Sequence, residues 1–190
     1  MRIVGGKHRG RRLNGPAGMD IRPTSDRARE ALFNILSHGD YAGPDGAMPE
    51  NMSVIDVFAG TGALGLEALS RGAATICFME QNRTAARAIQ DTAREMDAAD
   101  PVNVLTRDAT RPGQARDSFD LVLMDAPYRT GQSEPSLRAL ADLGWLHEGT
   151  ICCIELAKKE AFEAGADFSV LDERTYGAAR IVLLRWDGAD

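Results

Sequence analysis

The sequence predicts an α/β protein in which helices cover both faces of a mainly parallel sheet. From residue 53 onward, seven runs rich in β-branched and apolar residues alternate with helical stretches, which is typical of strand-helix-strand units. A glycine-rich loop follows the first of these strands. The last two runs meet at Tyr176-Gly177, which indicates an antiparallel hairpin at one edge of the sheet.

Residues 1–50 are predicted to form a small basic extension of a domain that spans residues 51–190. Residues 2–13 have the glycine-hinged pattern of a short hairpin. A helix should follow, capped by Thr24 or Ser25, and residues 39–50 are rich in glycine and proline and indicate a loop. The apolar face of that helix is expected to contain Ala28, Ala31, Leu32, Ile35 and Leu36.

The larger domain is expected to contain seven strands and three helices, because runs in which apolar residues repeat every two residues alternate with runs in which they repeat every 3.6 residues. The strands are predicted at 53–58, 75–80, 102–106, 119–124, 150–155, 168–173 and 179–186, and the helices near 62–71, 83–97 and 134–143.

Charge is distributed unevenly along the chain. The net charge is −6, but the first thirty residues hold eight Lys/Arg against three acids, which leaves +5 there and −11 over the other 160. Phosphate contacts need a local basic surface rather than a basic protein, so this extension is a candidate RNA-binding arm. A solvated charged arm without a partner is the alternative. The candidate RNA-binding residues are Lys7, Arg9, Arg11, Arg12 and Arg27.

Composition and apolar runs favour a cytoplasmic protein that has no membrane partner. No run of eighteen apolar residues is present, and the first residues lack the features of a signal peptide. The cysteines at 77, 152 and 153 lie in apolar runs and are expected to be buried structural residues. Three scattered histidines and the absence of a metal-ligand spacing predict no metal site.

The first strand leads into a loop that reads AGTGALG at residues 59–65 and matches G-x-G-x-x-G. This pattern fits a dinucleotide-binding loop, with Glu80 about twenty residues on. Asp56 separates the alternatives, because a carboxylate just before the glycines would repel a pyrophosphate. S-adenosylmethionine has no phosphate and carries positive ammonium and sulfonium groups. The loop therefore favours S-adenosylmethionine.

Two more carboxylates are placed to complete an adenosyl site. Glu80, after the second strand, can accept hydrogen bonds from both ribose hydroxyls, and Asp108, after the third, can accept one from the adenine amino group. A helix cap or a solvated loop end is the alternative for each acid. The cofactor-binding residues predicted in this domain are Asp56, Phe58, Gly60, Gly62, Glu80, Gln81, Asp108 and Ala109.

The stretch Asp125-Ala126-Pro127-Tyr128 directly follows the fourth predicted strand and is the candidate catalytic site. The Asp125 carboxylate and the Ala126 carbonyl can both accept hydrogen bonds from an exocyclic amine, whose nitrogen is otherwise a poor nucleophile. Pro127 favours an extended Ala126, and Tyr128 can stack on an unstacked base. A tight turn with a capping aspartate is the structural alternative.

The chain resembles the RsmD family of bacterial methyltransferases, which modify a guanine 2-amino group in 16S ribosomal RNA. The resemblance covers nearly the whole chain and rests on GGKHRGR at 5–11, RPTSDRAREALFN at 22–34, DVFAGTGALGLEALSRG at 56–72 and DAPY at 125–128. It departs from the family at Ala126, where a proline is usual, so a looser turn is expected.

The resemblance implies a Rossmann-like, seven-stranded methyltransferase fold and S-adenosylmethionine as the methyl donor. It also implies that Arg22, Thr24 and nearby residues close over the cofactor. The implied substrate is 16S ribosomal RNA within the 30S subunit or an assembly intermediate, and the protein is expected to act as a monomer.

Three other functions remain open from the residues. Amino methylation of another base, such as adenine in DNA or RNA, needs the same tetrapeptide. A noncatalytic ribosome-assembly protein could use the basic arm alone, although the retained Asp125, Pro127 and Tyr128 argue against this. An NAD-dependent oxidoreductase fits the glycine pattern but is disfavoured by Asp56.

Overall fold

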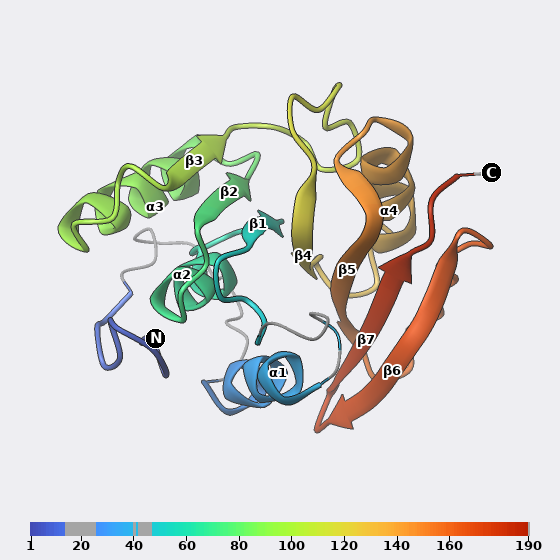
Figure 1. Cartoon of the computed structure of the whole chain (residues 1–190), viewed down its shortest axis with the longest axis horizontal. Coiled ribbons are helices and arrows are strands. Elements are labelled where there is room, and N and C mark those ends of the chain that lie inside the picture. Colours follow the sequence, from blue (N-terminus) through green and yellow to red (C-terminus); the bar gives the residue numbers. More distant parts are fainter. Residues whose placement is uncertain (14–25, 40, 42–46, 190) are drawn as a thin grey trace.

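The computed structural model describes residues 1–13, 26–39, 41 and 47–189, which contain one seven-stranded sheet with helices on both faces (Figure 1). The helices are α1 (Asp26–His38), α2 (Ala63–Ser70), α3 (Arg83–Glu95) and α4 (Ser133–Asp142). The strands are β1 (Ser53–Val57), β2 (Thr75–Met79), β3 (Val102–Leu105), β4 (Phe119–Asp125), β5 (Leu146–Ala157), β6 (Phe168–Tyr176) and β7 (Ala179–Trp186).

The strand order is β3-β2-β1-β4-β5-β7-β6. Strands β1 to β5 pair in parallel, whereas β7 is antiparallel to both β5 and β6. The predicted α/β class, the Rossmann-like fold and the antiparallel hairpin at the sheet edge are confirmed. The chain order reverses between β1 and β4, which is where ligands bind in open sheets of this kind.

Several elements differ in length from their predictions. Strand β5 begins at Leu146, four residues early, because Leu146 pairs with Phe119 before a register shift in β4. Strand β1 ends before Phe58, whose φ of 61° takes the backbone into the left-handed region. Strand β6 continues to Tyr176, since it stays paired with β7 up to the turn.

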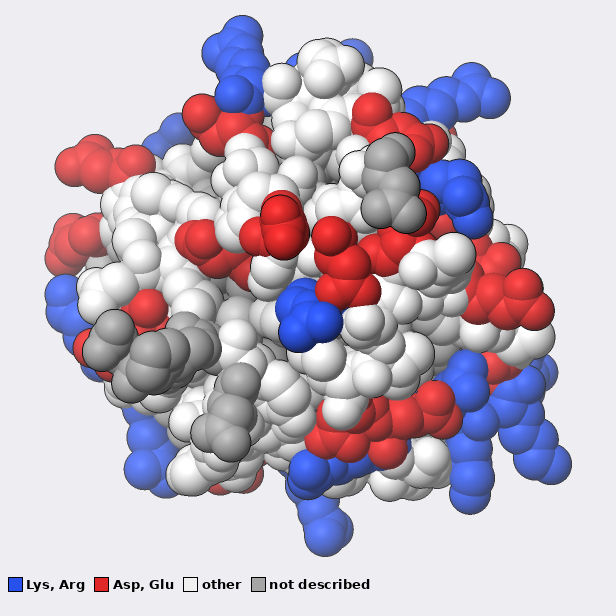
Figure 2. All heavy atoms as spheres, turned by 45° about the vertical axis from the view of Figure 1, so that its right-hand side comes forward, with Lys and Arg blue, Asp and Glu red and all other residues white. Residues whose placement is uncertain are grey.

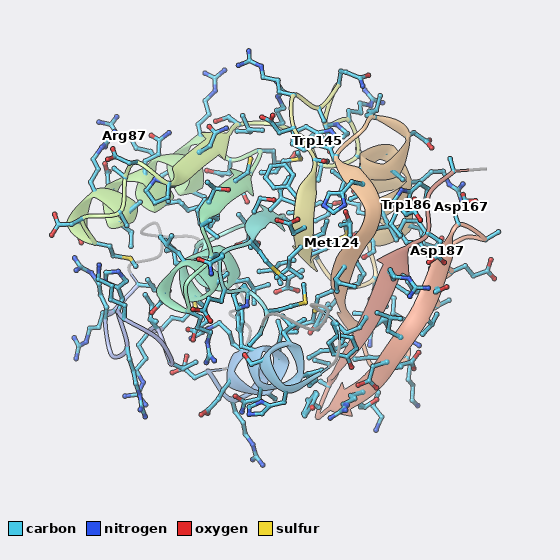
Figure 3. The ribbon with its side chains drawn as sticks, in the orientation of Figure 1. Arg87, Met124, Trp145, Asp167, Trp186 and Asp187 are labelled. Carbon is cyan, nitrogen blue, oxygen red and sulfur yellow. The ribbon has the colours of Figure 1, made fainter. Side chains whose placement is uncertain are left out.

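Two apolar layers cover the sheet. One layer, on the side of α1, α2 and α3, includes Val54, Phe78, Leu123, Leu32, Leu66 and Ile89. The opposite layer, on the side of α4, includes Ile55, Met79, Leu137 and also Met124 and Trp145, which Figure 3 labels. Alternate residues of each strand therefore enter different layers.

The N-terminal hairpin is confirmed by an antiparallel bridge between Arg2 and Arg12. Helix α1 buries a face that differs from the prediction, because Arg29 and Phe33 are buried whereas Ala31 is partly exposed. The expected cap residues, Thr24 and Ser25, lie outside the described residues. The division of the chain at residue 50 stays a prediction.

All three cysteines are buried, as predicted. Burial raises the pKa of Cys77 to about 12, so its thiol stays protonated at neutral pH.

In the part of the chain that the structure describes, no helix has the length and apolar character to cross a membrane. Within the same residues, no cluster of His, Cys, Asp and Glu side chains could hold a metal ion.

Candidate active site

Four carboxylates stand at the carboxyl ends of β2, β1, β4 and β5, which are neighbours in the sheet: Glu80, Asp56, Asp125 and Glu155. The residues two positions before them, Phe78, Val54, Leu123 and Cys153, all belong to the apolar layer under α1, α2 and α3. Because side chains alternate along a strand, all four acids face that side of the sheet. We call this group the acidic edge.

Asp56 is the most deeply placed member of the acidic edge. Its side chain is almost fully buried, and its Oδ2 accepts a hydrogen bond from the Gly65 N–H at 2.8 Å. Burial raises the pKa of Asp56 well above its ordinary value, the Gly65 bond lowers it, and Asp125 and Glu80 raise it again. A positive ligand here would favour the ionised carboxylates, whereas a negative one would oppose them.

Three left-handed residues shape the loop between β1 and α2. Phe58, Gly60 and Gly62 have φ of 61°, 55° and 74°. Gly65 has a different role, since a Cβ there would lie 2.4 Å from a ring carbon of Phe78 on β2. Only a glycine at this position lets α2 pack so closely on the sheet.

Four of the N–H groups between residues 59 and 65 already donate within the protein. Ala59 N donates to the Met79 carbonyl at 3.2 Å, Gly62 N to the Ala59 carbonyl at 2.7 Å, and Gly60 N to Glu80 Oε2 at 2.8 Å. The Gly65 N–H is held by Asp56. Pyrophosphate-binding loops need such N–H groups to point at the ligand. These four N–H groups are therefore not available to hold a pyrophosphate.

Glu80 lies just beyond β2 and is partly exposed. Besides Gly60 N, its carboxylate accepts from Asn82 N at 2.7 Å through Oε1. A carboxylate has about four acceptor positions, so each oxygen keeps one for a further donor. Glu80 thus holds the glycine loop against β2 and can still bind two hydroxyl groups.

The residues predicted to contact adenine follow the neighbouring strands. Asp108 is exposed beyond β3, and its Oδ1 accepts from Thr110 N at 2.9 Å and from Thr110 Oγ1 at 2.8 Å. These bonds lower the pKa of Asp108 and keep it ionised. Ala109 is buried and Gln81 is exposed. Arg22 and Thr24 lie outside the described residues.

The tetrapeptide begins at the last residue of β4, where Asp125 is half-buried and Ala126 is buried. The Pro127 carbonyl accepts from Thr130 Oγ1 at 2.6 Å, and Arg129 adopts a left-handed φ of 61°. Thr130 thereby closes a turn after the tetrapeptide, which gives local support downstream of Ala126.

Tyr128 is held by Glu155, a residue that the sequence interpretation missed. The Tyr128 hydroxyl donates to Glu155 Oε1 at 2.6 Å, and Glu155 pairs in register with Asp125 across β4 and β5. Glu155 ends the run predicted as a strand at 150–155, so the rule that drew attention to Asp56 could have found it. This bond fixes the ring beside the acidic edge.

The described hairpin of the basic arm is anchored at the end of α2 that is opposite the glycine loop. Lys7 N donates to the Ser70 carbonyl at 2.7 Å, and a Cβ on Gly6 would lie 1.8 Å from that oxygen, so the hairpin turn sits tightly on the last residue of α2. The glycine loop precedes the other end of this 8-residue helix, about 12 Å away.

The remaining candidate RNA-binding residues are spread over two elements. The guanidinium of Arg11 lies 3.7 Å from Glu95 Oε2, at the end of α3. Arg9 and Arg12 are exposed on the hairpin, and Arg27 is exposed on α1. In the described residues, the ion-pair partners of the hairpin arginines Arg2 and Arg11 are Asp26 and Glu95, so neither of these contacts brings positive charge to the acidic edge.

Comparison with known proteins finds one family and several close relatives. The family model described as "Conserved hypothetical protein 95" matches residues 1–185. "Ribosomal RNA small subunit methyltransferase D" of Haemophilus influenzae is 30% identical over 183 residues, covering 93% of this chain and 89% of that protein. The protein of that name from Escherichia coli is 34% identical over 155 residues, or 82% and 74% of the two chains.

A solved structure gives the same result for the fold. A putative methyltransferase from Escherichia coli superposes with a TM-score of 0.83 at 31% identity. The match covers 100% of this chain and 99% of that one. The likeness therefore includes the N-terminal hairpin and the antiparallel edge as well as the central sheet.

Proposed function

The chain belongs to the RsmD family, and from that membership and the acidic edge we propose that it is a ribosomal RNA methyltransferase. The reaction is transfer of a methyl group from S-adenosylmethionine to the exocyclic 2-amino group of a guanine in 16S ribosomal RNA. The observation that carries the proposal is a glycine loop in which Gly60 N and Gly65 N donate to the carboxyl groups of Glu80 and Asp56, which stand at the ends of two neighbouring strands.

The residues present fit S-adenosylmethionine better than a phosphate-bearing cofactor. Asp56 places a buried carboxyl group close to the loop, where a positive ligand would favour its ionised form, and Glu80 retains acceptor capacity for the ribose hydroxyls. Asp108 and Ala109 follow β3, where the adenine is proposed to lie. When bound, this cofactor supplies an electrophilic methyl group on a positively charged sulfur.

Asp125 and Ala126 are proposed to prepare the amine for attack. The Asp125 carboxylate and the Ala126 carbonyl accept the two N–H bonds of the 2-amino group, which directs the nitrogen lone pair away from the ring. Positive charge then grows on that nitrogen, and a nearby carboxylate stabilises it. Asp125 also accepts the proton that the nitrogen loses.

Tyr128 is proposed to hold the base after it leaves its stack. Unstacking costs a few kcal/mol, and stacking on an aromatic ring returns about 1–3 kcal/mol. Because Glu155 fixes the Tyr128 hydroxyl at 2.6 Å, the ring is oriented before the base arrives. The proposed substrate is 16S ribosomal RNA in the 30S subunit or an assembly intermediate, bound by a monomer in the cytoplasm.

The proposal is tested by incubating the protein with labelled S-adenosylmethionine and 30S particles from cells that lack this modification. Label is expected in 16S ribosomal RNA, and nucleoside analysis should identify it as 2-methylguanosine rather than N6-methyladenosine. Absence of label, with a folded protein that binds the cofactor, would refute the function. Methylated adenine would show that the target base is adenine rather than guanine.

Replacing Glu80 with glutamine is expected to weaken S-adenosylmethionine binding about tenfold or more, because a charge-assisted hydrogen bond contributes about 1.5–3 kcal/mol. The variant also loosens the bond that holds Gly60. Calorimetric titration measures the effect. Asp117→Asn, in the loop before β4, is the charge-matched control and should bind normally; equal affinity in both variants would remove Glu80 from the cofactor site.

Replacing Tyr128 with alanine is expected to lower kcat/KM for the particle by about 5- to 150-fold, the equivalent of about 1–3 kcal/mol of lost stacking. Tyr128→Phe keeps the ring but removes the bond to Glu155, so it should lose less. Single-turnover rates at several particle concentrations separate the two variants. If Phe and Ala were equally impaired, the hydroxyl tether rather than the ring would be the active feature.

A further inference from the structure

Helix α3 carries a row of arginines along its solvent-facing side. Arg83, Arg87 and Arg94 are four and seven residues apart, which places them on one face of the helix. Together with Ala86, Gln90 and Thr106 they line a hollow of about 340 Å³ between α3 and the end of β3. We call this hollow the α3 groove; Figure 3 shows Arg87 projecting outward from the helix.

Two of these arginines have no carboxylate partner among the residues that the structure describes. Arg83 and Arg87 are exposed, and neither makes a side-chain hydrogen bond or ion pair with any residue that the structure describes. Arg94, by contrast, is paired with Asp91 at 2.7 Å. Like charges one helical turn apart repel each other, so Arg83 and Arg87 favour an anionic ligand across the groove.

The α3 groove connects the two parts of the proposed RNA surface. At one end of α3, Glu95 contacts Arg11 of the basic hairpin at 3.7 Å. At the other end, Arg83 follows Glu80 of the acidic edge by three residues. The helix has 13 residues and is therefore about 20 Å long. The arginine row bridges the distance that separates the hairpin from the carboxylates.

Phosphates cannot be held by the acidic edge itself, because its carboxylates repel them. The face formed by β5 to β7 is also poorly suited to bind phosphates. Figure 2 shows Asp and Glu side chains across the middle of that face and Lys and Arg mainly at its margins. From β3 to β4 is three strand spacings, about 14 Å, so phosphates in the groove lie within a few nucleotides of a base at Asp125.

We propose that the α3 groove binds the phosphate backbone of the RNA that flanks the target base. The inference rests on the proposed function for the identity of the nucleic acid. Arg83 and Arg87 each contact a phosphate through the planar guanidinium, which suits bidentate binding. The groove positions the strand between the hairpin and the acidic edge and carries no base specificity.

The test compares the Arg83→Gln/Arg87→Gln variant with an Arg116→Gln/Arg138→Gln control that removes the same charge elsewhere. Arg116 lies in the loop before β4 and Arg138 on α4, and both are exposed. Protein-free 16S ribosomal RNA is the binding probe, titrated between 50 and 200 mM salt. Loss of two phosphate contacts should lower the salt slope by about 1.4–1.8 and the affinity at 0.1 M salt by about 25- to 60-fold.

The same variant should raise KM for unmodified 30S particles, leave kcat at saturation unchanged, and bind S-adenosylmethionine as the wild type does. Equal affinity and salt slope in the groove and control variants would overturn the inference. So would a loss seen with particles but not with protein-free RNA, because that would assign the groove to a ribosomal protein. If the wild type bound RNA without transferring methyl, the proposed function alone would fail, since the binding comparison stands by itself.

Discussion

Replacing Asp125 with alanine is expected to lower the rate of methyl transfer by about 10²–10⁴-fold, the range that a positioned acid-base group contributes. Asp125 ends β4 at the acidic edge and is the carboxylate proposed to accept the N–H of the target amine. S-adenosylmethionine binding should persist, because Asp56 and Glu80 are intact. Single-turnover transfer to 30S particles and calorimetric cofactor binding measure the two effects separately.

Asp125→Asn sharpens this experiment because it retains one acceptor oxygen but not the negative charge. It should be more active than Asp125→Ala if hydrogen bonding to the amine is the main contribution, and equally inactive if charge is. Asp117→Ala, in the exposed loop before β4, controls for the change in net charge. A full transfer rate in Asp125→Ala would contradict the catalytic role and leave the tetrapeptide as a structural turn.

The positions of the acids could be predicted because they depend on local pattern alone. A carboxylate that follows a buried strand must come to the carboxyl edge of a parallel sheet, which is how Asp56, Glu80 and Asp125 were found. Their partners could not be predicted in the same way. The bonds from Glu80 to Gly60 and from Tyr128 to Glu155 depend on which strands become neighbours.

Helix α1 shows where periodicity alone is insufficient. A 3.6-residue pattern assigns apolar residues to the buried face of a helix, so it predicts that Ala31 is buried and does not include Arg29. The structure buries Arg29 completely, because Glu67 on α2 provides negative charge 3.4 Å from its Nε. A partner 38 residues away leaves no trace in the local pattern of either helix.

The location of the basic surface is the other feature that the sequence left incomplete. The charge count predicts a positive surface in the first thirty residues. In the structure, the hairpin of this segment is anchored to the end of α2 that is opposite the glycine loop. The arginines of α3 were overlooked, since they alternate with acids such as Asp91 and Glu95 in a segment of ordinary composition. The four-residue spacing of Arg83 and Arg87 puts them on one helix face, but only the fold shows that this face is exposed and lines the α3 groove.

Replacing Glu67 with glutamine is expected to lower the free energy of unfolding by about 3 kcal/mol. Glu67 is fully buried; its carboxylate accepts from Val4 N and from Arg71 Nε, each at 2.8 Å, and also faces Arg29. Removing one partner of a buried ion pair typically costs 3–5 kcal/mol, because the other charge stays desolvated. The low end applies here, since Asp26 still pairs with Arg29 at 2.9 Å.

Urea unfolding of Glu67→Gln and of Asp91→Asn measures this effect against a matched control. Asp91 pairs with Arg94 at 2.7 Å on the exposed side of α3, where such a pair contributes less than about 1 kcal/mol. Arg29→Met/Glu67→Leu then identifies the cause. If desolvated charge is responsible, removing both charges should restore part of the stability. If the double variant were no more stable than Glu67→Gln, the contribution of Glu67 would instead lie in the bonds it accepts from Val4 N and Arg71 Nε.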